Sequence, residues 1–276
     1  MPCEQTSPAF SASPMKRSEP RALRIDPDPD GERRRAARAR LGIAGQGGEA
    51  RRRASVGRLL VLGLLALLFA SVAWVAALRV VDPPWSALML GEWLAAVRAG
   101  ERGFTLEREW RPASAISPLL ARAVVAAEDQ RFHRHHGFDF AAIEAALATH
   151  EAGGPLRGAS TITQQVAKNL FLWRGRHWLR KGLEAWFTIW IELLWPKARI
   201  LEVYLNVAQF GRGVYGAEAA SRRYFGRPAR ELDAAQAALL AAALPNPLRH
   251  RVEAPDERMR RRQQWILRQM RLAGGL

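Results

Sequence analysis

The chain is organised around one stretch, residues 126–139, which reads A-A-E-D-Q-R-F-H-R-H-H-G-F-D. An apolar run from Leu119 to Ala127 leads into it, and Ser117-Pro118 supplies an N-cap and a first helical residue for that run. Two acids, Glu128 and Asp129, therefore stand at the end of a mostly apolar helix. Partial burial raises the pKa of a carboxylate, which makes such an acid a suitable base near neutral pH.

Only one of these two acids can face a given cleft, because adjacent helical residues point about 100° apart. We predict that Glu128 is the base and that Asp129 is its supporting neighbour. A second interpretation stays open at this stage, in which Glu128 is an ordinary helix-end acid paired with Arg131 or His133.

Composition narrows the class of protein. The chain has 276 residues, a formal net charge of +16 and a single cysteine, Cys3. This length suits one substantial domain with appendages, and one cysteine excludes an intrachain disulfide. Residues 59–276 carry 29 basic and 19 acidic side chains, so this part is basic on its own. A basic domain suits nucleic acid, anionic lipid or a phosphorylated substrate. The absence of zinc-finger spacing and of an RNA-binding signature disfavours nucleic acid.

An uninterrupted apolar run of 20 residues, Leu59–Leu78, is long enough to span a bilayer. A signal peptide fits less well, because the run is long and lies far from the N-terminus. A buried core helix is the other alternative. Arginines at 51–53 and 58 precede the run, against Arg79 and Asp82 after it. The positive-inside rule then puts the N-terminal tail in the cytoplasm and the rest of the chain outside.

The remaining pattern predicts a mainly α-helical protein in three parts. Residues 1–56 are rich in Pro, Ser, Gly and Arg without an apolar period, which indicates a disordered basic tail. Residues 57–79 form the transmembrane helix, and residues 80–276 form the external domain. Strand-like alternation is scarce in that domain. Its expected helices cover 91–102, 119–127, 138–150, 160–172, 180–195, 196–206, 217–225, 234–244 and 256–272.

A second informative stretch places polar groups on one helix face. Ser160, Gln164 and Lys168 lie four residues apart, with Gln165 at the edge of the same face. A hydroxyl, an amide and an ammonium, together with the donors of a helix N-terminus, could hold sugar hydroxyls or phosphate oxygens. The alternative is simple helix capping and a solvated polar face.

The segment 171–181 mixes basic and aromatic residues, as sequences at a bilayer surface do. Single-stranded nucleic acid would suit it too, but the external location argues against that ligand. Arg176, Arg180 and Lys181 are therefore candidate phosphate ligands.

Glu184 lies in an apolar helix, where an unpaired carboxylate is costly unless it has a function. An intrahelical pair with Arg180 is the structural alternative. The histidines at 133, 135 and 136 lack a second cluster of ligands, so we predict no metal held by the protein.

The motifs resemble one known family. In order they are E-D-Q-R-F-H-R-H-H-G-F-D (128–139), G-A-S-T-I-T-Q-Q-V-A-K-N-L-F-L (158–172), R-K-G-L-E (180–184), I-L-E-V-Y-L-N-V-A-Q-F-G-R-G-V-Y-G-A-E-A-A (200–220), Y-F-G-R (224–227) and A-L-L-A-A-A-L-P-N-P (238–247). Residues 80–274 thereby resemble the monofunctional biosynthetic peptidoglycan transglycosylases, family 51 glycosyltransferases of bacterial inner membranes. The resemblance implies a lysozyme-like, two-lobed glycosyltransferase domain in the periplasm, preceded by a single transmembrane helix.

The resemblance also implies roles for particular residues. Glu128 would deprotonate the 4-hydroxyl of the acceptor's N-acetylglucosamine in lipid II, with Asp129 as its support. Glu184 would act near the donor's diphosphate. The implied binding residues for the diphosphate and the adjoining sugars are Ser160, Gln164, Lys168, Arg176 and Arg180. Gln236 stands where the family often has Glu, so we assign it no catalytic role.

The same resemblance implies the partners. The donor is a glycan linked to undecaprenyl diphosphate. Attack on the donor's anomeric carbon inverts the configuration of that carbon and releases undecaprenyl diphosphate. Membrane lipids and other cell-wall synthases are further expected partners, and nucleic acid is not. No cofactor is required, although a divalent cation could bridge the substrate diphosphate. We expect no transpeptidase activity. The rival functions are a muramidase, which would not need Lys168, Arg176 and Arg180, and a catalytically silent membrane scaffold.

Overall fold

The computed structural model describes residues 28–154, 160–175 and 177–272. This part of the chain is mainly α-helical, which confirms the predicted class. The helices are α1 (Pro29–Ala77), α2 (Ala87–Arg98), α3 (Pro118–Glu128), α4 (Phe140–Glu151), α5 (Ile162–Phe171), α6 (Trp178–Leu194), α7 (Lys197–Val207), α8 (Ala217–Phe225), α9 (Ala234–Ala243) and α10 (Glu257–Leu272). Two short 3₁₀ turns cover Ala113–Ala115 and Ala229–Glu231.

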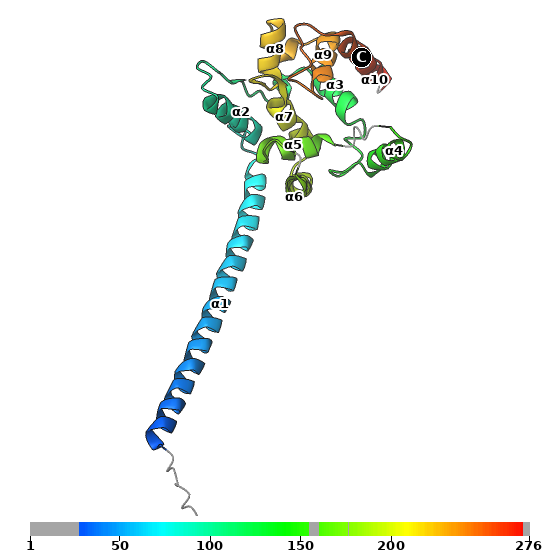
Figure 1. Cartoon of the computed structure of the whole chain (residues 1–276). Coiled ribbons are helices and arrows are strands. Elements are labelled where there is room, and N and C mark those ends of the chain that lie inside the picture. The colour runs from blue at the N-terminus through cyan, green and yellow to red at the C-terminus, as the bar shows by residue number, and fades with distance from the viewer. Residues whose placement is uncertain (1–27, 155–159, 176, 273–276) are drawn as a thin grey trace, which may run out of the picture. The chain divides into compact units, whose positions relative to one another are not determined.

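The domain core is built from two groups of helices. In one group, α3, α9 and α10 pack on one another, and in the other α5 packs on α2, α6 and α7 (Figure 1). Buried apolar side chains from both groups, among them Leu120, Val166 and Leu240, join in one hydrophobic cluster. The end of α3 and the start of α5 meet between the groups, so the two stretches that the sequence singles out lie next to each other.

A small sheet that the sequence does not predict joins these helices. Strand β3 (Val214–Tyr215) pairs in parallel with β1 (Glu107–Arg108) and antiparallel with β2 (Gln209–Gly211). Each strand has only two or three residues. Strands this short cannot show the alternation of apolar and polar residues by which sequence reasoning finds a strand.

Several helices begin where a side chain caps them rather than where the apolar pattern begins. α5 starts at Ile162, two residues later than predicted, because Thr161 and Gln164 form a capping box. α2 starts at Ala87, four residues earlier than predicted, after the N-cap Ser86. Gln236 has the same capping role, together with Asp233, at the start of α9.

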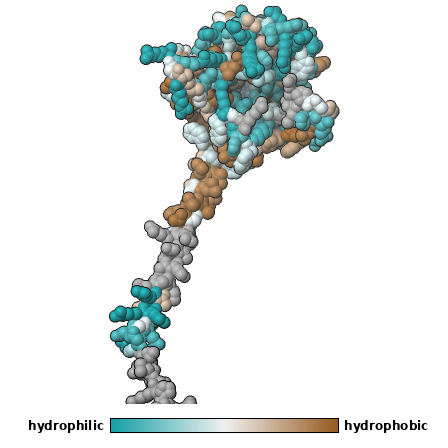
Figure 2. Space-filling model, in the orientation of Figure 1, coloured by the Kyte–Doolittle hydropathy of each residue, from teal (hydrophilic) through white to brown (hydrophobic). Residues whose placement is uncertain are grey.

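Helix α1 is longer than the predicted span. Tail residues 1–27 lie outside the described part, but from Pro29 onward the predicted disordered tail is helical. The arginines, alanines and glutamates of this segment are good helix formers, and they continue a helix that the apolar run has already formed. Within α1, Ser55–Ala77 is long and apolar enough to cross a membrane. Only 6% of the most apolar part of this segment is buried inside the protein. Figure 2 shows apolar side chains on its surface.

Two arginines and a tryptophan of the domain hold the chain where it leaves α1, and we call Arg108, Trp110 and Arg199 the exit clamp. Both guanidinium groups lie over the Trp110 ring, 5.6 and 5.4 Å from its centroid. They donate hydrogen bonds to backbone carbonyl groups at 2.6–3.3 Å, and Arg108 makes one shorter bond in addition. The accepting carbonyls belong to Leu78, Val81, Pro83 and Pro84. These carbonyl groups at and beyond the end of a helix would otherwise lack partners.

Side chains of α6 and its C-cap reach the same end of α1. The indole of Trp195 donates to the carbonyl of Val75 at 2.8 Å, and the indole of Trp186 donates to the hydroxyl of Ser71 at 3.2 Å. Arg199 adds an ion pair with Asp82 at 2.8 Å. Residues 71–84 are therefore bound to the domain over their whole length.

Candidate active site

Glu128 is the last residue of α3, and its carboxylate faces a cleft. Its side chain is 12% exposed. One carboxylate oxygen accepts a hydrogen bond from the amide of Gln165 at 2.9 Å, and the other accepts from the guanidinium of Arg262 at 3.2 Å. Three segments far apart in the sequence, α3, α5 and α10, thereby converge on one acid.

The surroundings of Glu128 suit a base. Burial raises the pKa of the Glu128 carboxyl, and the hydrogen bond from Gln165 and the charges of Arg262 and Lys168 oppose that rise without cancelling it. A carboxylate whose pKa lies above its ordinary value accepts a proton more readily at neutral pH. The alternative partners are not realised, because Arg131 pairs with Asp139 at 3.3 Å and His133 lies in another cavity.

Asp129 is buried beside Glu128 and supports the site from behind. Its carboxylate lies 2.9 and 3.0 Å from the Nε2 atom of His135 and accepts a hydrogen bond from the backbone N–H of Ile162 at 3.0 Å. The hydrogen bond from Ile162 ties the end of α3 to the first residue of α5. Asp129 therefore joins the end of α3 to the start of the helix that carries Gln165.

The cleft at Glu128 has a volume of about 860 Å3, and we call it the base cleft. Ser160 and Gln165 line it from the α5 side, and Trp265 and Arg262 line it from α10. Beside it lies a hollow of about 380 Å3, which we call the cation pocket. Gln165 and Pro245 line both spaces, so the two adjoin, and we call them together the groove.

The cation pocket holds two of the predicted basic residues, and Lys181 does not line it. Lys168 of α5 and Arg180 of α6 line it, together with Arg174 and Tyr204. Burial and the charge of Arg180 lower the pKa of the Lys168 ammonium, and Glu184 and Glu128 act in the opposite direction. Lys168 forms no ion pair with any carboxylate in the described part of the chain, so its charge can be used by a ligand. Arg176, the fourth predicted phosphate ligand, lies outside the described residues.

Glu184 lies beneath these cations and does not line the groove. Its buried carboxylate accepts from Arg180 at 3.0 Å and from Lys181 at 2.5 Å. The intrahelical pair with Arg180, one of the two readings of the sequence, is therefore present. Because the charge of Glu184 also acts on Lys168, this acid can hold three cations around the pocket.

The two adjacent glutamines of α5 differ from the expected arrangement. Gln164 is buried and its amide oxygen accepts from the backbone N–H of Thr161 at 3.0 Å, so it caps the helix and lines neither space. Gln165 faces the groove instead and also accepts a bond from Tyr204 at 3.1 Å. The difference follows from the start of α5 at Ile162, which makes Gln164 the third residue of the helix.

Arg262 is the functional residue that sequence reasoning missed. It is one of many arginines in α10, and nothing in the local sequence separates it from the solvated ones. Its contact with Glu128 spans 134 positions of the chain. The one usable signal is the apolar period of α10, which places residue 262 near the edge of the buried face.

Gly137 fixes the loop behind the site, and its substitution gives a first prediction. Its φ is +86°, and a Cβ atom there would lie 2.8 Å from Cγ2 of Thr188 and 3.0 Å from Cγ of Glu192. Its carbonyl also accepts from the Thr161 hydroxyl at 2.7 Å. We expect Gly137→Ala to lower the free energy of unfolding by about 2–4 kcal/mol, through backbone strain and overpacking.

Urea unfolding in detergent measures this change. Gly182→Ala is the matched control, because no atom lies within 4 Å of a Cβ at position 182 of α6. The control should leave the protein as stable as before or slightly more stable. Equal stability of the two variants would show that the loop at Gly137 can relax.

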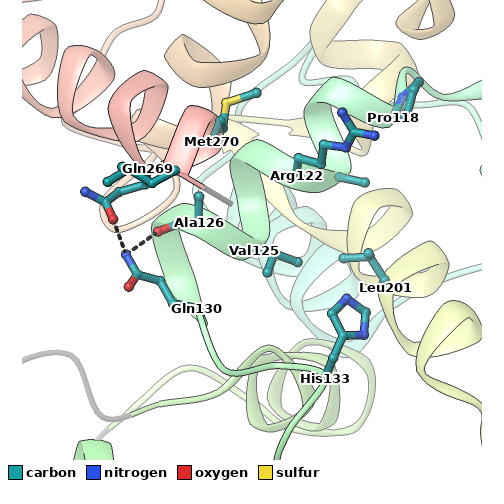
Figure 3. Close-up of a pocket in the computed structure, with 11 residues that line it drawn as sticks. Pro118, Arg122, Val125, Ala126, Gln130, His133, Leu201, Gln269 and Met270 are labelled. Atoms are coloured by element: carbon teal, nitrogen blue, oxygen red, sulfur yellow. Dashed lines mark hydrogen bonds between the residues drawn. The ribbon is translucent and has the colours of Figure 1, made fainter. Parts of the chain in front are cut away.

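A separate cavity of about 580 Å3 is lined by residues of α3, α7 and α10 (Figure 3). Arg122, Val125 and His133 line it, and Gln130 donates to Gln269 of α10 at 3.4 Å across its edge. Neither Glu128 nor the cations of the groove contribute to it. Residues 28–154, 160–175 and 177–272 hold no cluster of three His, Cys, Asp or Glu that could bind a metal ion.

Comparison with known proteins shows the family to which the chain belongs. The family model described as Transglycosylase matches residues 96–271. The chain is 56% identical over 211 residues to a biosynthetic peptidoglycan transglycosylase of Xanthomonas campestris pv. campestris (strain B100), which covers 76% of this chain and 86% of that protein. It is 53% identical over 218 residues to the protein of the same name from Xylella fastidiosa (strain M23), which covers 79% and 89%. The chain therefore belongs to the transglycosylase family and is a peptidoglycan glycosyltransferase of the monofunctional biosynthetic type.

Proposed function

We propose that the protein polymerises lipid II into linear glycan strands. The single observation that carries this proposal is that one groove holds a desolvated carboxylate, Glu128, beside a pocket of cations that includes Lys168 and Arg180. The acceptor's sugar lies in the base cleft, and the donor's diphosphate lies in the cation pocket.

The reaction follows from this placement. Glu128 takes the proton of the acceptor's 4-hydroxyl. At the same time the oxygen of that hydroxyl forms a bond to the donor's anomeric carbon, from the face opposite the diphosphate. The bond from that carbon to the diphosphate breaks, so the configuration inverts and undecaprenyl diphosphate leaves with the bonding electrons. Lys168 and Arg180 stabilise the charge that develops on the leaving group, in a groove where partial burial strengthens that interaction. Glu184 keeps the cations in place from below. A divalent cation could assist by bridging the diphosphate.

A muramidase is the main rival function, and the burial of Glu184 argues against it. A retaining or inverting hydrolase uses two carboxyl groups that flank a glycosidic bond. Glu184 is buried under Arg180 and Lys181, so it does not face the groove as the second carboxyl group would have to. Glu128 is the only acid among the described residues that line the base cleft. Asp129 and Asp139, which line an adjoining hollow with Glu128, are bound by His135 and Arg131.

The test is an assay of purified protein in detergent with labelled lipid II, with and without a chelator. Polymer formation supports the proposal, degradation of finished glycan supports the muramidase, and inertness supports a scaffold. Loss of polymer on chelation would show that a divalent cation takes part. Peptide cross-links in the product would contradict the proposed absence of transpeptidase activity.

We further propose that the tail is cytoplasmic and that the domain acts in the periplasm at the inner membrane. Four arginines precede the apolar segment at positions 51–53 and 58, and a lipid-linked substrate requires a groove near the bilayer. Apolar side chains on the outer side of α6 support this: Trp178 is 80% exposed and Leu193 is 69% exposed. Protease added to sealed spheroplasts should degrade the domain, and protection of the domain would reverse the assigned topology.

Arg262 gives a prediction about pH. Its charge lowers the pKa of Glu128 against the effect of burial, so Arg262→Gln should raise that pKa further. The base is active only when ionised, and the acid limb of the profile of kcat/KM against pH should therefore move to higher pH. We expect a several-fold loss of polymerisation at pH 6 and little loss at pH 8.5.

Arg261→Gln is the matched control, because Arg261 is 70% exposed and pairs only with its helical neighbour Glu257, at 3.2 Å, among the described residues. Its profile should coincide with that of the unmodified protein. A loss for Arg262→Gln that is equal at every pH would show that Arg262 binds substrate and does not tune Glu128.

A further inference from the structure

The part of the base cleft formed by the end of α9 and the start of α10 is basic, and the reaction proposed above does not use it. Arg249 and His250 follow α9, and Arg258 begins α10; all three line the cleft with Asn246. We call Arg249, His250 and Arg258 the arginine wall. Both of its arginines are exposed, and neither side chain forms a hydrogen bond or ion pair with another described residue.

The surrounding sequence leaves this wall with an excess of positive charge. Residues 246–272 contain eight arginines against three acids. Two of those acids are occupied elsewhere: Asp256 caps α10 by accepting from the backbone N–H of Met259 at 2.7 Å, and Glu257 pairs with Arg261 at 3.2 Å. In the described part of the cleft, Glu128 is the only acid, and it is already bound by Gln165 and Arg262. The wall therefore faces the cleft with arginine side chains that no carboxylate among the described residues pairs with, and these can bind an anionic ligand.

The lipid end of the substrate lies elsewhere. Apolar side chains are exposed along α6, and Trp186 on this helix is bound to Ser71 near the end of the apolar segment of α1. The cation pocket takes Arg180 from α6 itself and Lys168 from α5, which packs on α6. Figure 1 shows α9 and α10 on the other side of α5 from α6. A diphosphate attached to a lipid fits the cation pocket, so the arginine wall faces a part of the substrate farther from the bilayer.

We infer that the arginine wall is a subsite for the carboxylates of the acidic peptide that the glycan substrate carries. This inference rests on the proposed function and names a further part of its substrate. Guanidinium groups bind carboxylates through two parallel hydrogen bonds, which an amide of the same shape cannot accept in the same way. A cleft of about 860 Å3 has room for a sugar together with the first part of its substituent.

The test compares two lipid-linked disaccharide diphosphates, one with an acidic peptide and one whose peptide carboxylates are amidated. We expect the unmodified enzyme to have a kcat/KM about tenfold higher for the acidic substrate, the effect of one charge-assisted contact at a partly exposed site. Arg249→Ala/Arg258→Ala should remove that preference while keeping the rate on the amidated substrate. Arg268→Ala, an exposed arginine of α10 outside the cleft lining, is the control and should keep the preference.

Two results would overturn the inference: no preference in the unmodified enzyme, or an equal loss on both substrates in the double variant. A calorimetric titration with the soluble disaccharide-peptide, which has no lipid or diphosphate, separates this inference from the proposed function. Tighter binding of the acidic form than of the amidated form, lost in the double variant, would support the subsite even if lipid II were not polymerised. Equal binding of the two forms would contradict it even if polymerisation were observed.

Discussion

Replacement of Glu128 by glutamine should reduce the turnover of lipid II by at least about 10²-fold, the lower end of the usual contribution of a general base. The amide keeps the shape of the side chain and can still accept a hydrogen bond from Gln165 or Arg262. It cannot accept the proton of the attacking hydroxyl. Substrate binding, measured with a fluorescent lipid-linked analogue, should change little.

The same variant has a second readout, because burial raises the pKa of Glu128 in the folded state. The stability that this group contributes is complete below its unfolded pKa and is lost as the pH rises through the folded pKa. Glutamine is uncharged throughout, so Glu128→Gln should melt at a higher temperature than the unmodified protein at pH 8. The difference should disappear near pH 4.

Glu144→Gln, on the exposed side of α4, is the matched control and should change neither turnover nor melting. Turnover of Glu128→Gln within tenfold of the unmodified enzyme would overturn the assignment of the base. A lower melting temperature for Glu128→Gln at pH 8 would show that the pair with Arg262 outweighs the cost of burying the charge.

The second large effect concerns Lys168. Lys168→Ala should lower kcat/KM for the donor by about 10²–10³-fold, as the loss of one preorganised group that stabilises a developing anion does. Binding of the acceptor should weaken much less, because Lys168 lines the cation pocket and not the base cleft. Assays with donor and acceptor supplied as separate substrates measure the two effects. Equal effects on both would indicate a merely structural lysine.

Lys168 should also set the alkaline limb of the pH profile. Burial lowers the pKa of its ammonium, so its charge is lost at a lower pH than that of an ordinary lysine. Lys168→Arg keeps the charge at every accessible pH and should move this limb upward, with part of the activity retained. An alkaline limb that stays in place in Lys168→Arg would assign it to another group.

Much of this architecture is predictable from local patterns. The apolar period of residues 119–127 ends at Glu128, and that period alone places a carboxylate at the end of a buried helix. The mainly helical class and the apolar segment of α1 follow from patterns of the same kind. In each case the information is contained within one helix, where burial repeats with the helical period.

What sequence reasoning missed depends on contacts between distant segments or on single capping residues. Arg262 reaches Glu128 across 134 positions, and no local pattern distinguishes it from its neighbours. The choice between Gln164 and Gln165 depends on whether α5 begins at Ser160 or at Ile162. With Ile162 as the first residue of α5, Gln164 is the third, where its side chain turns back to cap the helix N-terminus, and Gln165 is the glutamine that faces the groove.

The exit clamp has a mechanical consequence. Two consecutive prolines, Pro83 and Pro84, follow α1, and neither has a backbone N–H that could donate a hydrogen bond to the domain. The guanidinium of Arg108 donates hydrogen bonds to both of their carbonyl groups instead. With Arg199 bound to Leu78 and Val81, the end of α1 cannot swivel without breaking contacts to the domain. A spanning helix tilts according to the thickness of its bilayer. The clamp therefore ties the end of α1 to the domain, so a change in the tilt of this end would turn the domain with it or break the clamp.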